Sequence, residues 1–165
     1  MTLTAWTLTF PQAAPVPIKK TYTLSTPKSW TELGDDVLKT TMATGLYKTT
    51  FATPASFGKD SKVLLDLGDV RESARVVING KEAGTLFAVP YRLDITPYIK
   101  KGKNTLEVYV TNLPANRIAQ MDRDGIKWRR FKDANVVDIN YQRTTYDAWT
   151  PMPSGLCSDV KILYY

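Results

Sequence analysis

The sequence predicts an all-β protein: a single domain over residues 1–165 that folds as a two-sheet β-sandwich of the jelly-roll type. Three observations carry this prediction. Apolar and polar residues alternate in about eight short segments, the pattern of half-buried antiparallel strands. The 10 prolines and 9 tyrosines are typical of strands joined by loops rather than of helical bundles. A length of 165 residues suits one domain.

The clearest strands lie in the middle of the chain. They are predicted at 62–68, 73–78, 82–87, 91–95 and 104–111. Between the second and third, Asn79-Gly80 predicts a tight hairpin turn, because both central residues of such a turn take a positive φ. After the fourth, Thr96 and Pro97 predict one helical turn, with Thr96 as its N-cap and Pro97 at its first helical position.

The flanks contain fewer strands and two segments without a strand pattern. Strands are predicted at 6–10, 47–51 and 159–165. Residues 11–33 are rich in Pro, Lys, Ser and Thr, and we expect them to wrap around the sandwich in an extended conformation. Residues 114–155 are longer than an ordinary loop, which indicates a functional role or further structure, and we expect residues 136–141 to pair at a sheet edge.

Composition excludes several kinds of site. The chain has no histidine, which excludes Ser-His-Asp and Cys-His catalysis and histidine-ligated metals. Its single cysteine, Cys157, allows no internal disulfide and no thiolate zinc site. No apolar run approaches the roughly 18 residues of a membrane span, so no membrane partner is predicted. The net charge of +6 suits an acidic polymer, but 16 dispersed acidic residues argue against nucleic acid.

A basic and aromatic segment is the candidate site. Residues 116–133 contain six basic and three acidic side chains. The net charge of this segment, +3, is half of the net charge of the whole chain, +6. Aromatic rings beside guanidinium groups suit sugars, because a pyranose has an apolar C–H face and hydroxyls, and arginine binds uronic carboxylates in a bidentate way. The candidate carbohydrate-binding residues are Arg117, Trp128, Arg129, Arg130, Tyr141 and Trp149.

A structural interpretation of the same segment stays open. In it, Trp128 and Trp149 anchor a long loop onto the sandwich while the arginines pair with neighbouring aspartates. The sequence Asp122-x-Asp124-Gly125 matches only the beginning of a calcium-binding loop and lacks the later ligands. No cofactor is therefore predicted, with a structural calcium ion as the remaining alternative.

Several motifs resemble those of a known family. Residues 65–81, which begin Leu-Asp-Leu-Gly and end Val-Ile-Asn-Gly-Lys, together with residues 84–96 and 102–108, resemble the galactose-binding-like jelly-roll domains of family 2 glycoside hydrolases. The similarity is closer to the accessory and C-terminal domains of family 106 α-L-rhamnosidases. Thr-Asn-Leu-Pro-Ala-Asn-Arg at 111–117 and Pro-Ser-Gly-Leu at 153–156 are similar to further stretches of these domains.

The sequence also departs from this family at two places. Cys157-Ser158-Asp159 stands where the family usually has Leu-Gly-Pro, and Thr44 replaces a serine before Gly45. The resemblance implies a galactose-binding-like sandwich without catalytic residues, because the catalytic carboxylates of such enzymes belong to a separate barrel domain. We expect the chain to be an excised module of a larger, exported enzyme, located outside the cytoplasm.

The predicted function is that of a non-catalytic carbohydrate-binding module. Its ligand would be a plant-type glycan, pectic in character and containing rhamnose or uronate, and its protein partner the catalytic domain of the parent enzyme. One alternative is a purely structural domain that packs on that catalytic barrel. Another is a small polysaccharide-active enzyme in its own right, in which Tyr141 or Lys127 would act as the base.

Overall fold

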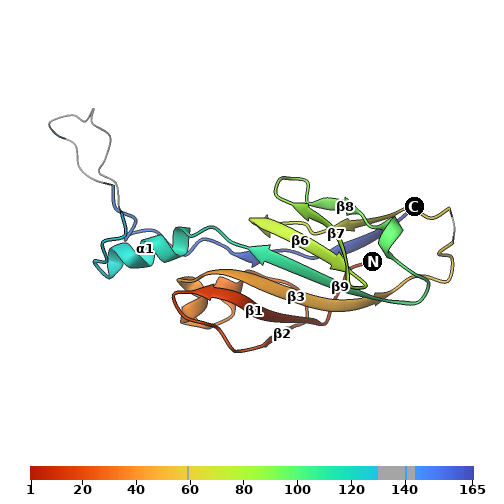
Figure 1. The fold of residues 1–165 in the computed structure, drawn as a ribbon, viewed down its shortest axis with the longest axis horizontal. Coiled ribbons are helices and arrows are strands. Elements are labelled where there is room, and N and C mark those ends of the chain that lie inside the picture. The colour runs from red at the N-terminus through yellow and green to blue at the C-terminus, as the bar shows by residue number, and fades with distance from the viewer. Residues whose placement is uncertain (59, 130–139, 141–143) are drawn as a thin grey trace.

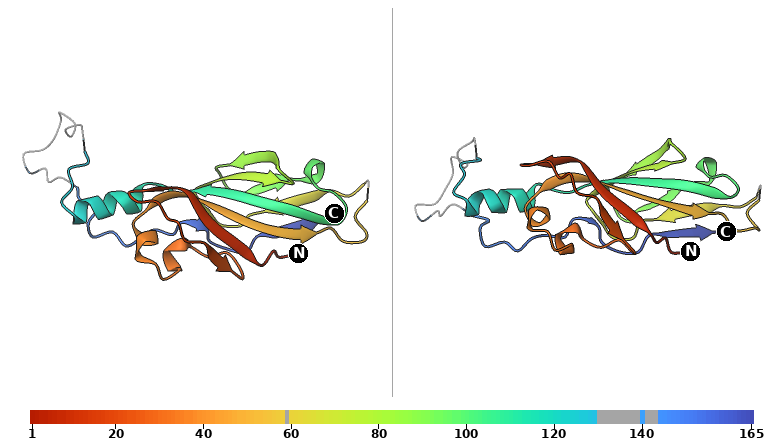
Figure 2. Two further views of the ribbon diagram at one scale, coloured as in Figure 1. Left: turned by 60° about the horizontal axis from the view of Figure 1, so that its bottom comes forward. Right: turned by 90° about the horizontal axis from the view of Figure 1, so that it is seen from below.

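The computed structural model describes residues 1–58, 60–129, 140 and 144–165, and these form two layers of antiparallel strands (Figure 1, Figure 2). The strands are β1 (Trp6–Ala14), β2 (Tyr22–Leu24), β3 (Met42–Ala52), β4 (Val63–Asp66), β5 (Val70–Arg71), β6 (Ser73–Ile78), β7 (Lys81–Leu86), β8 (Arg92–Asp94), β9 (Lys103–Thr111), β10 (Gly155–Leu156) and β11 (Lys161–Tyr164). The helical elements are the 3-10 turns η1 (Trp30–Glu32), η2 (Asp36–Lys39) and η3 (Thr96–Tyr98), and the α-helix α1 (Ala115–Arg123).

One layer is a six-stranded sheet and the other is made of two smaller sheets. The strand order of the large sheet is β2-β1-β3-β9-β6-β7, and the second layer consists of β11-β4-β8 and β10-β5. The two chain termini lie at one end of the molecule, and α1 lies at the other end (Figure 1). No helix among the described residues has the length and apolar character to span a membrane.

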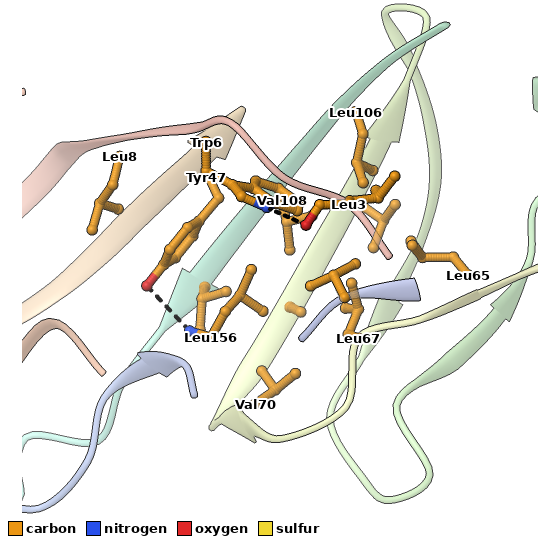
Figure 3. Packing of buried hydrophobic residues seen from close by; sticks show 14 of the residues in the cluster. Leu3, Trp6, Leu8, Tyr47, Leu65, Leu67, Val70, Leu106, Val108 and Leu156 are labelled. Atoms are coloured by element: carbon orange, nitrogen blue, oxygen red, sulfur yellow. Dashed lines mark hydrogen bonds between the residues drawn. The ribbon is translucent and has the colours of Figure 1, made fainter. Parts of the chain in front are cut away.

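The core lies between the two layers. Inward side chains of both, such as Leu8, Leu65 and Val108, are fully buried (Figure 3). Burying each large apolar side chain stabilises the fold by about 1.5–3 kcal/mol. The polar atoms of two buried rings are satisfied: Trp6 Nε1 donates to the Leu3 carbonyl at 3.2 Å, and Tyr47 Oη accepts from the Leu156 N–H at 3.1 Å (Figure 3). Burial raises the pKa of Tyr47, which therefore stays neutral.

The predicted fold class and the central strands are confirmed. The strand expected at 73–78 is β6 with the same bounds, and 104–111 is β9 extended by one residue. The hairpin forms at the predicted turn, with φ values of 50° at Asn79 and 77° at Gly80. In the flanks, the predicted strand at 6–10 is the first part of the longer β1, and the predicted strand at 47–51 lies in the last part of the longer β3.

The predicted cap of the helical turn is wrong by one residue. Thr96 is the first residue of η3, and Ile95 precedes it without a capping side chain. The Thr96 hydroxyl is engaged elsewhere: it donates to Asp94 at 2.6 Å and accepts from the Val63 N–H at 2.9 Å. This threonine therefore joins two strands of the small sheet instead of capping the turn.

Both segments without a strand pattern contain regular structure. Residues 11–33 include the end of β1, the three-residue strand β2 and η1, whose Trp30 is fully buried. Residues 114–155 include α1, which the sequence did not reveal, because Pro114 precedes it without a capping side chain and nine residues show little periodicity. The edge strand expected at 136–141 lies, apart from Asn140, outside the described residues.

Candidate functional site

The chain between β9 and β10 projects from the end of the sandwich. Its described residues, 114–129, 140 and 144–154, are called the arm here, and α1 forms its outgoing half (Figure 1). At the base, the Asn116 amide exchanges two hydrogen bonds with the backbone of Met152, at 2.9 and 2.7 Å. Further out, Arg123 donates to the carbonyls of Asp147 and Trp149 at 3.0 and 3.1 Å. These contacts hold the two halves of the arm together.

Three aromatic rings and one guanidinium group pack on one another in the arm. The ring centroids of Trp128 and Tyr146 lie 6.3 Å apart, and those of Tyr146 and Trp149 lie 4.8 Å apart. Arg129 Cζ lies 4.9 Å from the Trp128 ring and 5.5 Å from the Tyr146 ring. The Arg129 guanidinium also donates to the Thr144 carbonyl. The rings and the cation are thus held in place before any ligand binds.

Asp122 organises this cluster from the C-terminal turn of α1. One carboxylate oxygen accepts from Trp128 Nε1 at 2.6 Å, and the other accepts from the Tyr146 N–H at 2.8 Å. The two oxygens of one carboxylate can accept from different directions. Asp122 therefore joins Trp128 to Tyr146 on the returning half of the arm. Asp122 was not among the predicted site residues, since its role depends on a backbone N–H 24 residues away.

A pocket of about 300 Å³ opens beside this cluster. Its lining residues are Asp122, Gly125, Ile126, Lys127, Trp128, Arg129, Thr144 and Thr145. The volume is at the lower limit for small-ligand sites, about 300–1,000 Å³. An indole, two cationic side chains and two hydroxyls can provide stacking, charge-assisted hydrogen bonds and neutral hydrogen bonds to one ligand.

The structure brings only some of the six predicted residues to this pocket. Trp128 and Arg129 line it, whereas Trp149 packs on Tyr146 with 48% of its surface exposed. Arg117 is half-buried on α1 and is not among the lining residues. Arg130 and Tyr141 lie outside the described residues.

The contacts within the arm bear on the structural interpretation of this segment. Trp128 and Trp149 both pack on Tyr146, which lies within the arm itself. The hydrogen bonds of Arg123 run to Gln120 and to two carbonyls. The arm is therefore bonded internally, and 48% of the Trp149 surface stays exposed.

The described residues also bear on whether the chain has a metal site, a reactive thiol or a catalytic base. No group of three or more acidic or cysteine side chains in this part of the chain could hold a metal ion. Burial raises the pKa of Cys157 to about 11, so its thiol stays protonated at neutral pH. Of the two bases that an enzymatic role would require, Lys127 lines the pocket and Tyr141 lies outside the described residues.

Replacing Asp122 by alanine is expected to disorganise the aromatic cluster without unfolding the sandwich. The Trp128 indole and the Tyr146 N–H would both lose their acceptor, so the near-ultraviolet circular dichroism of the stacked rings should fall. The free energy of unfolding should change by less than about 1 kcal/mol, since the arm lies outside the core. Asp124→Ala is the matched control, because among the described residues its carboxylate accepts from Gln120, one helical turn earlier, and joins no other segment. An unchanged spectrum for Asp122→Ala would contradict this account.

Comparison with known proteins identifies the domain type. The family model described as "Glycosyl hydrolase 2 galactose-binding domain-like" matches residues 33–151, which include most of the arm. A curated protein of Formosa agariphila, named "Putative beta-glucuronidase", is 37% identical over 152 residues, which are 82% of this chain and 13% of that protein.

Solved structures agree with this assignment. A rhamnosidase from Novosphingobium sp. PP1Y is 28% identical with a TM-score of 0.78, over 100% of this chain and 15% of that one. A beta-D-glucuronidase of Dictyoglomus thermophilum, 17% identical, shares the fold with a TM-score of 0.64 over 99% of this chain and 27% of its own. This chain thus spans only a small part of the length of these relatives. With its antiparallel sandwich and this match over most of its length, the chain belongs to the glycosyl hydrolase 2 galactose-binding domain-like family.

Proposed function

We propose that this chain is a non-catalytic carbohydrate-binding module of a larger polysaccharide-degrading glycoside hydrolase. The family assignment supports an accessory role, and the relatives that carry this domain are named as a rhamnosidase and a beta-glucuronidase. The parent enzyme would act outside the cytoplasm, where its polymeric substrate is found. The domain would need no cofactor, because stacking and hydrogen bonding are sufficient to bind a sugar.

The pocket on the arm is the observation that carries this proposal. Trp128 offers an aromatic surface for the C–H face of a pyranose, and Thr144 and Thr145 offer hydroxyls for its polar edge. Lys127 and Arg129 favour a ligand with a carboxylate. Asp122 carries the one negative charge among the described lining residues, against the two positive charges of Lys127 and Arg129. The best ligand is therefore an acidic glycan, such as a pectic chain that contains uronate.

Isothermal titration calorimetry with an oligogalacturonide and a rhamnogalacturonan fragment tests the proposal. We expect a Kd of about 10 μM to 1 mM for a single site of this size. Trp128→Ala should weaken binding about 10-fold or more, since the stacking surface is lost. Arg117→Ala is the control, because that side chain also belongs to the arm but does not line the pocket. An equal affinity of Trp128→Ala and the unmodified protein would remove the pocket from the site.

Docking on the catalytic domain of the parent enzyme is the second candidate function. The arm exposes large apolar side chains at Ile126, Trp149 and Met152, with 42%, 48% and 42% of their surface accessible. It also projects from the end of the sandwich, where it could reach another domain (Figure 1). Co-elution of this domain with the separately expressed remainder of the parent enzyme, weakened by Trp149→Ala but not by Arg117→Ala, would favour this role.

A further inference from the structure

A groove crosses the outer face of the six-stranded sheet, on the side away from the core. Two hollows, of about 400 and 320 Å³, adjoin there and share Gln12, Thr44 and Thr111. The larger hollow is lined by Pro11, Gln12, Thr44, Ser73, Arg75, Thr85, Tyr109 and Thr111. The smaller one continues along β1 and β3 toward Pro114 at the base of the arm. The two hollows together are called the outer groove here.

A bulge in β1 turns a side-chain amide into this groove. Thr9 pairs with Leu46, but Gln12 pairs with Thr44, so β1 has one residue more than β3 in this interval. The side-chain alternation of β1 therefore shifts at Pro11, and Gln12 comes to the same face as Thr44. Without the shift, Gln12 would point into the core, where Ala13 now packs. Bulges of this kind often redirect a side chain next to a binding site.

The pairing register brings polar side chains together in two rows across the sheet. In the first row, Gln12, Thr44, Thr111 and Ser73 are register neighbours on four adjacent strands. The hydroxyls of Thr44 and Thr111 lie 2.9 Å apart. In the second row, Arg75 pairs with Tyr109, and its Cζ lies 4.0 Å from the centroid of the tyrosine ring. This contact holds both side chains, which lowers the entropic cost of ordering them around a ligand.

The charges around the outer groove are paired with one another. Arg75 forms an ion pair with Glu82 at 3.4 Å. Tyr109 donates its hydroxyl to Glu107 at 3.1 Å, and Glu107 in turn pairs with Lys48 at 2.8 Å. Among the described lining residues, Arg75 is the only charged one, and Glu82 balances it. The outer groove therefore offers amide and hydroxyl groups without an excess of charge, in contrast to the cationic pocket on the arm.

We propose that the outer groove is a second saccharide-binding site and that it takes a neutral oligosaccharide. Hydroxyl groups donate and accept at once, so a row of them matches the hydroxyls of an uncharged sugar chain. The groove crosses four strands, which suits several linked sugar units rather than one. This site goes beyond the pocket on the arm and does not depend on it, because the two differ in place and in charge.

NMR titration of the isotopically labelled chain with xylohexaose, cellohexaose and a β-1,4-galactan hexasaccharide, each up to about 10 mM, tests the proposal. At least one of them should shift the amide signals of Thr44, Arg75 and Tyr109, and the affinity should be the same at low salt and at about 0.5 M salt. Thr44→Val combined with Thr111→Val should weaken binding about 10-fold, since shape is kept and two hydroxyls are lost. Thr50→Val is the control on the same strand and face, outside the lining.

The outcomes separate this site from the one on the arm. Trp128→Ala should leave binding of the neutral sugar unchanged even if it abolishes binding of the oligogalacturonide. Failure of all three neutral probes to shift the groove signals would overturn the proposal. So would an undiminished affinity of the double valine variant, or binding at the groove that is confined to acidic sugars and lost in salt.

Discussion

Gly155→Ala is expected to destabilise this domain by about 4 kcal/mol, a large part of the stability of a typical domain. Gly155 is buried at the start of β10 with a φ of 94°, a conformation that residues with a side chain rarely adopt. A Cβ atom there would lie 2.2 Å from Tyr47 Oη and 2.9 Å from the Trp30 ring. Both rings are fully buried, so they cannot move aside without opening the core.

The hydrogen bond between Tyr47 and the Leu156 N–H would be lost at the same time, because a shift of the tyrosine ring removes the acceptor. Urea unfolding measures the effect. Gly34→Ala is the matched control: its φ of 76° is similar, but a Cβ atom there meets nothing within 4 Å. It should cost only about 1–2 kcal/mol, the backbone contribution alone. Equal losses for the two variants would show that contact with the two rings does not matter.

Asn112→Ala is expected to cost about 3 kcal/mol, because one buried amide satisfies three partners at the end of the sandwich from which the arm projects. Its Oδ1 accepts from the Ala43 N–H at 2.9 Å. Its Nδ2 donates to the Thr41 carbonyl and to Ser154 Oγ, each at 3.1 Å. Asn112 therefore joins β9, β3 and the returning end of the arm, and its loss leaves buried polar groups without partners. Leu113→Ala next to it, 52% exposed, should change the free energy of unfolding by less than about 1 kcal/mol.

Asn112→Asp is expected to make the free energy of unfolding depend on pH. The new carboxyl would replace the Nδ2 donor, so one oxygen would face the Thr41 carbonyl in a buried site. Burial and this contact should raise the pKa of the carboxyl in the folded state above the unfolded value of about 3.9. Its favourable, protonated form is then present below that value and is lost as the pH rises through the folded pKa. The variant should thus lose more stability relative to the unmodified protein at about pH 7 than at about pH 4. A loss independent of pH would contradict the role of the Nδ2 donor.

The sequence predicted part of the candidate site on the arm and missed the rest. Trp128 and Arg129 were predicted from composition and do line a pocket. Asp122 and Tyr146 were not predicted, because their roles depend on a contact between the two halves of the arm. The groove on the outer face of the sheet gave no local signal either. Gln12, Thr111 and Arg75 are far apart in the sequence and ordinary in type.

The sequence by itself determined which faces of the central strands enter the core and where the chain turns between β6 and β7. Leu106, Val108 and Val110 alternate with polar residues, and a period of two leaves only one way to bury them. Only the tertiary structure decided that Gln12 faces outward and that Asp122 meets Tyr146. The physical reason is that a bulge and a hydrogen bond across the arm depend on partners distant in the chain, whereas side-chain alternation is a local property of each strand.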